Sequence, residues 1–131
     1  MAETKGFFSI IQFCPDLDRE ETANVGVVLI VPGLRYFDVR FSEDNEAPKQ
    51  RFGVGTIDDT RLAVAKRAIE GRLRHELTDC SGSEDLVAFA KKEGNHLRLT
   101  APRIALVKDA AGELDELYRR LVHLEVSSDR S

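Results

Sequence analysis

The stretch ETANVGVVLIV, residues 21–31, decides the fold, because polar residues change there within a few positions into the longest apolar run of the chain. The run over 25–31 shows no alternation of polar and apolar residues, so we expect a strand over 24–31 that is buried on both faces. Gly26 lies inside this strand, and a glycine at such a position indicates a bulge or the close approach of another backbone.

Two further strands are predicted, one on each side of this run. Residues 6–13 (GFFSIIQF) are rich in aromatic and β-branched side chains, and Pro15 ends this strand because it lacks the N–H that a strand ladder requires. Residues 34–41 (LRYFDVRF) alternate, so one face is expected to be buried and the other solvated. One face carries Phe37, Val39 and Phe41, and the other face carries Tyr36, Asp38 and Arg40. Because the three strands follow one another closely along the chain, an antiparallel meander is the economical pairing.

Helical spacing dominates the second half of the chain. Three segments are expected to be helices: 56–77, 84–93 and 111–124. The longest one has Thr56 as a candidate N-cap, and Asp58 and Asp59 suit the positive end of its dipole. Residues 42–55 have no period and predict a long loop. Residues 96–107 alternate around a proline, so they predict an edge strand or two short strands.

Together these elements predict one α+β domain over residues 1–131. We expect a small antiparallel sheet, an N-terminal three-strand meander plus an edge strand, packed against two or three helices. The chain length suits one domain of roughly 100–150 residues. A hydrophobic share of 42% is enough to build a core.

Charge and cysteine content exclude several classes of protein. The formal net charge of −4 argues against non-specific attachment to nucleic acid or to anionic lipid, which requires a positive field. Cys14 and Cys80 lie far apart without CxxC spacing, so we expect neither a zinc site nor a disulfide framework, and Cys14 is expected to be buried. No apolar run approaches the roughly 18 residues of a membrane helix, and no signal peptide is evident. We therefore expect a cytoplasmic protein without a cofactor.

An acidic cluster precedes the central strand and suggests one enzymatic alternative. It contains Asp16, Asp18, Glu20 and Glu21. The spacing lacks the glycine and the closing glutamate of an EF-hand, so a solvated acidic loop is the favoured interpretation. In the alternative, Asp16, Asp18, Glu21 and Asn24 hold Mg²⁺ and activate water, as in a metal-assisted hydrolase or nuclease.

Basic side chains on the helix predicted over 56–77 suggest a third class of function. Lys66, Arg67, Arg72 and Arg74 are expected on its outer face, with Glu70 interrupting them. A solvated helix face is the favoured interpretation, and nucleic-acid binding is the alternative. Aromatic residues do not interleave with these charges, so no stacking platform for single strands is visible.

The span FFSIIQFCPDLDREETANVGVVLIVPG, residues 7–33, resembles the bacterial and phage domain-of-unknown-function family DUF3037. The family pattern is a strand ending in Pro-Asp, then Arg-Gly-Glu, two residues, and Asn-Val-Gly-Val-Val. The matching positions are Pro15, Asp16, Arg19, Glu21, Asn24, Val25, Gly26, Val27 and Val28. Glu20 departs from the pattern, because it stands where the family has glycine. A second similarity is the TAPR motif at residues 100–103, before a Leu-rich terminal helix.

The resemblance implies a small standalone protein that is often encoded beside a HipA-like kinase-domain protein, and it implies no established chemistry. The sequence shows no nucleophile–base pair. Our leading hypothesis is therefore a non-enzymatic regulatory protein that binds and modulates a protein partner encoded beside it, in a toxin–antitoxin or phage-defence context. Nucleic acid is a less favoured partner, no membrane is expected, and self-association into a homo-oligomer is compatible with the sequence.

The binding residues proposed on this basis are Asp16, Arg19, Glu21 and Asn24. Two interpretations of the last three remain open. They either converge on a partner at the edge of the sheet, as loop residues on rigid scaffolds often do, or satisfy backbone groups where the buried strand begins. In both cases we expect Arg19, Glu21 and Asn24 to form one polar cluster at the junction of the first two strands.

Overall fold

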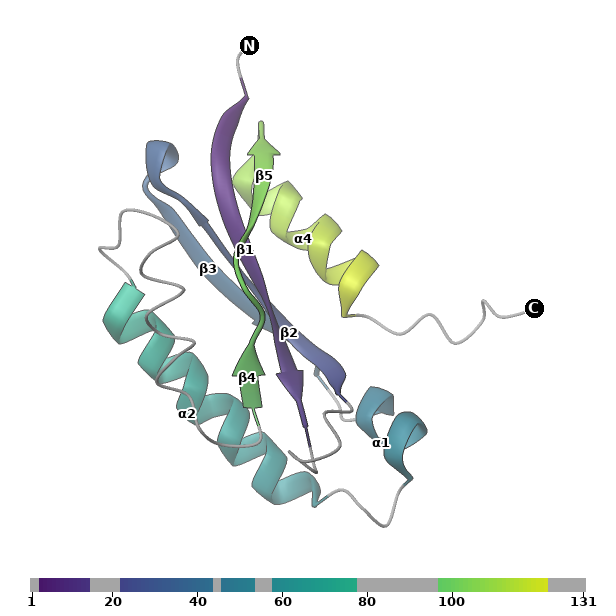
Figure 1. Cartoon of the computed structure of the whole chain (residues 1–131). Coiled ribbons are helices and arrows are strands. Elements are labelled where there is room, and N and C mark those ends of the chain that lie inside the picture. The colour runs from purple at the N-terminus through teal and green to yellow at the C-terminus, as the bar shows by residue number, and fades with distance from the viewer. Residues whose placement is uncertain (1–2, 15–21, 44–45, 54–57, 78–96, 123–131) are drawn as a thin grey trace, which may run out of the picture.

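A computed structural model describes residues 3–14, 22–43, 46–53, 58–77 and 97–122 (Figure 1). Its strands are β1 (Thr4–Phe13), β2 (Ala23–Val31), β3 (Tyr36–Phe41), β4 (Leu97–Leu99) and β5 (Arg103–Val107). Its helices are α1 (Glu46–Phe52), α2 (Asp59–Leu77) and α4 (Ala110–Leu121), and a short 3-10 turn, η1 (Pro32–Leu34), joins β2 to β3. A small antiparallel sheet with helices confirms the predicted α+β fold.

The sheet is built around β1. The strand order is β3-β2-β1, and both β4 and β5 pair with the other side of β1, always antiparallel. The predicted meander of β1, β2 and β3 is therefore confirmed. β5 pairs with the N-terminal half of β1 and β4 with its C-terminal half, so the segment around Pro102 forms two short strands, one of the two predicted arrangements.

Thr100 maintains the hydrogen bonding to β1 across the break between β4 and β5. Its backbone N–H donates to the Ile10 carbonyl at 2.9 Å, and its hydroxyl oxygen Oγ1 accepts the Ile10 N–H at 2.9 Å. The hydroxyl thus accepts the Ile10 N–H in place of a strand carbonyl, close to Pro102, whose missing N–H interrupts the strand ladder. Both backbone groups of Ile10 are satisfied at a point where neither short strand pairs with it.

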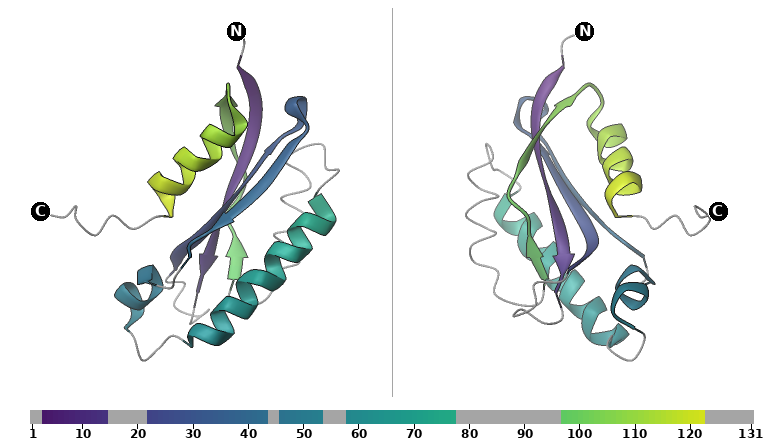
Figure 2. Two further views of the ribbon diagram at one scale, coloured as in Figure 1. Left: turned by 180° about the vertical axis from the view of Figure 1, so that it is seen from behind. Right: turned by 45° about the vertical axis from the view of Figure 1, so that its right-hand side comes forward.

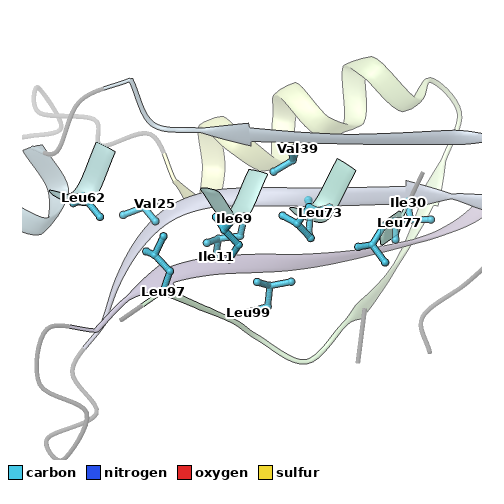
Figure 3. Packing of buried hydrophobic residues seen from close by; sticks show 11 residues of the cluster. Ile11, Val25, Ile30, Val39, Leu62, Ile69, Leu73, Leu77, Leu97 and Leu99 are labelled. Carbon is cyan, nitrogen blue, oxygen red and sulfur yellow. The ribbon is translucent and has the colours of Figure 1, made fainter. Parts of the chain in front are cut away.

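Two helices cover opposite faces of the sheet and create two hydrophobic cores, as the edge-on view in Figure 2 shows. One core lies against α2, and Figure 3 shows its side chains: Ile11, Val25, Ile30, Val39, Leu62, Ile69, Leu73, Leu77, Leu97 and Leu99. The other lies against α4 and includes Phe8, Val27, Leu29, Val31, Ala105, Val107, Leu114, Leu117 and Tyr118. β2 contributes to both cores, which confirms the prediction that this strand is buried on both faces.

A bulge near the start of β2 explains how its side chains are distributed. Ile11 pairs with Gly26 but Gln12 pairs with Asn24, so Val25 is the extra residue. Val25 consequently faces α2 although Val27 faces α4. Gly26 is also approached closely, because a Cβ there would lie 2.8 Å from Phe41 Cδ1. The bulge and the close approach predicted from Gly26 are both present.

The prediction of a loop over 42–55 is wrong in part, because α1 lies within it. Pro48 occupies the first turn of this helix, where a missing N–H removes no helical hydrogen bond. Gly53 ends the helix with a φ of 93°, and its N–H donates to the Lys49 carbonyl at 2.8 Å. Seven residues are too few to show a helical repeat in the sequence.

The other helix boundaries differ slightly from those predicted. α2 begins at Asp59, and the Asp58 carboxylate accepts the Arg61 N–H at 3.1 Å, so Asp58 acts as its N-cap. Thr56 and the helix predicted over 84–93 lie outside the described residues. α4 ends at Leu121, three residues before the predicted end.

Ser9 provides a test of the packing against α2. Its side chain is fully buried on β1, and its hydroxyl has no hydrogen-bond partner in the described part of the chain. An unsatisfied buried hydroxyl is unfavourable by about 1–3 kcal/mol, so Ser9→Ala should raise the free energy of unfolding by about 1 kcal/mol in urea titrations. Thr100→Val is the matched control, because it deletes a hydroxyl that is bonded and should lower stability. A loss of stability in Ser9→Ala would show that this hydroxyl is satisfied.

Candidate functional site

Asn24 is the one predicted binding residue that the structure describes; Asp16, Arg19 and Glu21 lie outside the described residues. The Asn24 side-chain amide makes hydrogen bonds through both its oxygen and its nitrogen. Its Oδ1 accepts from Gln12 Nε2 at 3.0 Å, and its Nδ2 donates to the Leu121 carbonyl at 2.9 Å. That carbonyl belongs to the last turn of α4, where carbonyls have no helical partner. Asn24 therefore links β1, β2 and the end of α4, and its cluster with Arg19 and Glu21 stays a prediction.

Substitution of Asn24 tests this link. Asn24→Ala leaves the Leu121 carbonyl and the Gln12 amide without their partner, so we expect the free energy of unfolding to fall by about 1–3 kcal/mol. Gln12→Ala removes one of the two bonds and keeps the helix carbonyl satisfied, so its effect should be smaller. Urea titrations of the two variants measure the difference. Equal stability of Asn24→Ala and the unmodified protein would contradict a structural role.

The prediction that Lys66 lies on the outer face of α2 is wrong. Lys66 is buried, and its Nζ donates to the Ser42 carbonyl at 3.1 Å and to Ser42 Oγ at 3.0 Å. The sequence held a signal for this, because Lys66 lies four residues after Leu62 and three before Ile69, within the buried stripe. Lys66 thus fixes the chain after β3 instead of contributing to a basic surface.

Arg74 is likewise engaged within the protein. Its Nη2 donates to Asp38 Oδ1 at 2.9 Å and its Nε to Glu70 Oε2 at 3.0 Å. Burial acts to lower the pKa of Arg74, but the hydrogen bonds that its guanidinium donates to the carboxylates of Asp38 and Glu70 outweigh burial and raise that pKa. The other two basic residues predicted on this helix face, Arg67 and Arg72, are exposed. Because Lys66 and Arg74 are bonded within the protein, the support for a nucleic-acid surface on α2 is weaker.

The edge of the sheet at β3 is protected by charged side chains. Asp38 Oδ1 accepts the N–H of Val39 at 2.8 Å, so a carboxylate satisfies a strand N–H there. Arg40 pairs with Asp115 of α4, and its guanidinium lies 4.3 Å from the centre of the Tyr118 ring. Charges and side-chain capping of this kind prevent another strand from pairing with an edge.

Electrostatics at this edge also affect Tyr36, the first residue of β3. Burial raises the pKa of Tyr36, and the negative charges of Asp38 and Asp109 raise it further. The neutral phenol is therefore favoured in the folded protein. Ionisation of Tyr36 at alkaline pH should destabilise the fold.

The opposite edge, formed by β5, carries one charged residue at its start, Arg103, and apolar residues over the rest of the strand. β5 pairs with β1, and no strand of the described ranges pairs with its other side. Ala105 and Val107 are buried in the core against α4. The alternating residues of β5, Ile104 and Leu106, point to the other face of the sheet and are 62% and 60% exposed. We call the outer side of β5, with these two side chains, the open edge.

The open edge exists because α2 covers only part of its face of the sheet. The core against α2 receives Leu97 and Leu99 from β4 but no residue from β5. Figure 1 shows the same arrangement, with α2 packed near β4 and away from β5. The neighbours of the exposed pair on β1 are Phe7, opposite Ile104, and Lys5, opposite Leu106. Two aliphatic side chains on a strand that is paired on one side in the described ranges form a surface to which another polypeptide can add.

Other kinds of site find no support in the described residues. These contain no group of three or more His, Cys, Asp or Glu side chains that could hold a metal ion. The acidic residues of the hydrolase alternative precede Thr22 and lie outside the described residues, while the Asn24 side chain makes the structural bonds given above. Cys14 is buried, as predicted. Within the same part of the chain, no helix is both long enough and apolar enough to cross a membrane.

Comparison with protein families shows a match over most of the chain. The model of the family described as "Protein of unknown function (DUF3037)" matches residues 8–122. The match extends from β1 to the end of α4, far beyond the strand motif that first suggested the resemblance. No curated protein and no solved structure matches the chain.

Proposed function

The chain belongs to the DUF3037 family, and on that premise we propose that it is a small cytoplasmic regulatory protein that binds and modulates a protein partner. The partner we propose is a protein encoded beside it, of the HipA-like kinase-domain class that the family resemblance implies, in a bacterial or phage setting. The family carries no established chemistry, so the proposal depends on the surface of the molecule.

The observation that carries the proposal is the contrast between the two edges of the sheet. β3 is protected by Asp38 and Arg40, whereas β5 presents two aliphatic side chains and no protecting charge between them. Unprotected edge strands aggregate or bind, and natural proteins therefore leave them open chiefly where a partner pairs with them. We propose that an extended segment of the partner adds to β5. Main-chain hydrogen bonds then supply affinity, and Ile104 and Leu106 supply specificity.

A matched pair of variants tests this proposal. Leu106→Glu places a charge on the open edge, and Val64→Glu makes the same kind of change at a 55% exposed residue on the outer face of α2. Tagged proteins are purified from the native host. We expect the unmodified protein and Val64→Glu to retain a stoichiometric protein partner, and Leu106→Glu to bind it at least roughly 30-fold more weakly, as expected for a central interface residue.

Two results would contradict the proposal. The first is recovery of no stoichiometric partner with folded, unmodified protein. The second is retention of the partner by Leu106→Glu, which would move the interface away from β5. Circular dichroism spectra of all three proteins serve as the control for folding.

A further inference from the structure

From the residues of the open edge we infer that two copies of this chain pair through β5, forming a two-fold symmetric dimer that covers the partner surface. The regulatory part of this inference rests on the proposed function, because self-pairing and partner binding then compete for one edge. The pairing itself rests on the sequence and geometry of β5 alone.

The strand is self-complementary when two copies pair antiparallel around Ala105. In that register Ile104 of each copy lies opposite Leu106 of the second copy, so the exposed aliphatic side chains cover one another twice. Cross-strand aliphatic pairs of this kind stabilise antiparallel sheets. The buried face is preserved, because Ala105 and Val107 remain against α4 in both copies.

Charges at the two ends of β5 favour the same register. Arg103 and Asp109 are both exposed, and Asp109 lies two residues past the end of β5, in the bend before α4. Arg103 then lies opposite Val107 of the second copy, which is the last residue of that copy's β5, and the chain continues from there to Asp109. Opposite charges therefore come near one another at each end of the paired strands.

The charged residues of this segment lie at its two ends, with Arg103 at the start of β5 and Lys108 and Asp109 just after its last residue. After a two-fold rotation, opposite charges at the two ends of one segment face their counterparts on the second copy, so the segment is complementary to itself. The asymmetry of charge is therefore a property expected of a self-pairing edge.

The dimer should be weak. An edge of five residues buries less than the roughly 1,200 Å² of a standard stable interface. We expect a monomer–dimer equilibrium that shifts with protein concentration, which allows a tighter partner to displace the second copy. Self-pairing would then shield the open edge from aggregation until the partner binds.

Sedimentation equilibrium over a concentration series tests the pairing. For the unmodified protein we expect the average mass to rise from 14.7 kDa toward twice that value as the concentration approaches about 1 mM. Leu106→Glu should remain monomeric at every concentration. Val64→Glu, outside the open edge, should behave as the unmodified protein does.

A charge exchange tests the register. Arg103→Asp and Asp109→Arg should each raise the dimer dissociation constant roughly tenfold, because two symmetry-related pairs are lost. The double variant should restore it, since each new pair again joins opposite charges. Asp109→Asn is a second variant that removes the charge without placing a positive one at the start of α4, and it should weaken the dimer less.

Distinct results separate this inference from the proposed function. A purely monomeric unmodified protein at about 1 mM overturns the dimer. It leaves the proposed function standing if Leu106→Glu still loses the partner. Dimerisation by Leu106→Glu moves self-association away from β5 and also overturns the inference. A double variant as weak as the single ones overturns the register, whereas its recovery supports it.

Discussion

Leu117→Ala should lower the free energy of unfolding by about 2–5 kcal/mol. Leu117 lies in the middle of α4 and is completely buried in the core between that helix and the sheet. Its truncation removes apolar contacts and leaves a cavity, because close-packed neighbours relax only in part. Urea titration monitored by circular dichroism measures the change.

Leu106→Ala is the matched control for this prediction. The same atoms are removed, but Leu106 is 60% exposed on the open edge, so stability should change by less than about 0.5 kcal/mol. Similar losses for the two variants would show that β5 is covered in solution. That result would support a dimer that is populated under the conditions of the titration. Dilution of the protein should then abolish the loss of stability caused by Leu106→Ala.

Gly26→Ala should lower the free energy of unfolding by about 1–3 kcal/mol, because a new Cβ overpacks the contact between β2 and β3. That Cβ would lie 2.8 Å from Phe41 Cδ1 and 3.1 Å from the Arg40 carbonyl oxygen. The ring of Phe41 can shift, but the backbone of a paired strand moves only with its neighbours. Strand β3 is consequently displaced.

The same substitution at Gly71 should have the opposite sign. Gly71 lies on the outer side of α2, and a Cβ there would meet nothing within 4 Å. Gly71→Ala should therefore raise stability by about 0.5–1 kcal/mol through helix propensity. Thermal melting of both variants shows whether each substitution raises or lowers stability. Stabilisation by Gly26→Ala would contradict the close approach of β3 at the bulge.

Much of the fold could be predicted because its signals are local. The apolar run over 25–31 identified a strand buried on both faces, and Gly26 within it identified the bulge. Pro102 indicated a break, and two short strands flank it. A seven-residue helix such as α1 gives too little periodicity, although Pro48 in its first turn and Gly53 at its end are typical of helix boundaries.

The features that escaped prediction depend on contacts between distant segments. Asn24 could be expected to bond a backbone group, but the group is the carbonyl of Leu121, which lies 97 positions away. Apart from Arg103, the residues of β5 are apolar on both faces, so the sequence alone could not show which face a helix covers. The exposure of Ile104 follows only from the placement of α2 near β4.

The most direct test of the open edge as a recognition surface is hydrogen–deuterium exchange with and without the co-purified partner. Backbone amides of an unpaired edge exchange readily, and they become protected when another strand pairs with them. We predict slower deuterium uptake over residues 103–107 in the complex, and unchanged uptake over residues 36–41 of β3. Protection that appears in β3 or α2, with uptake in β5 unchanged, would contradict the assignment.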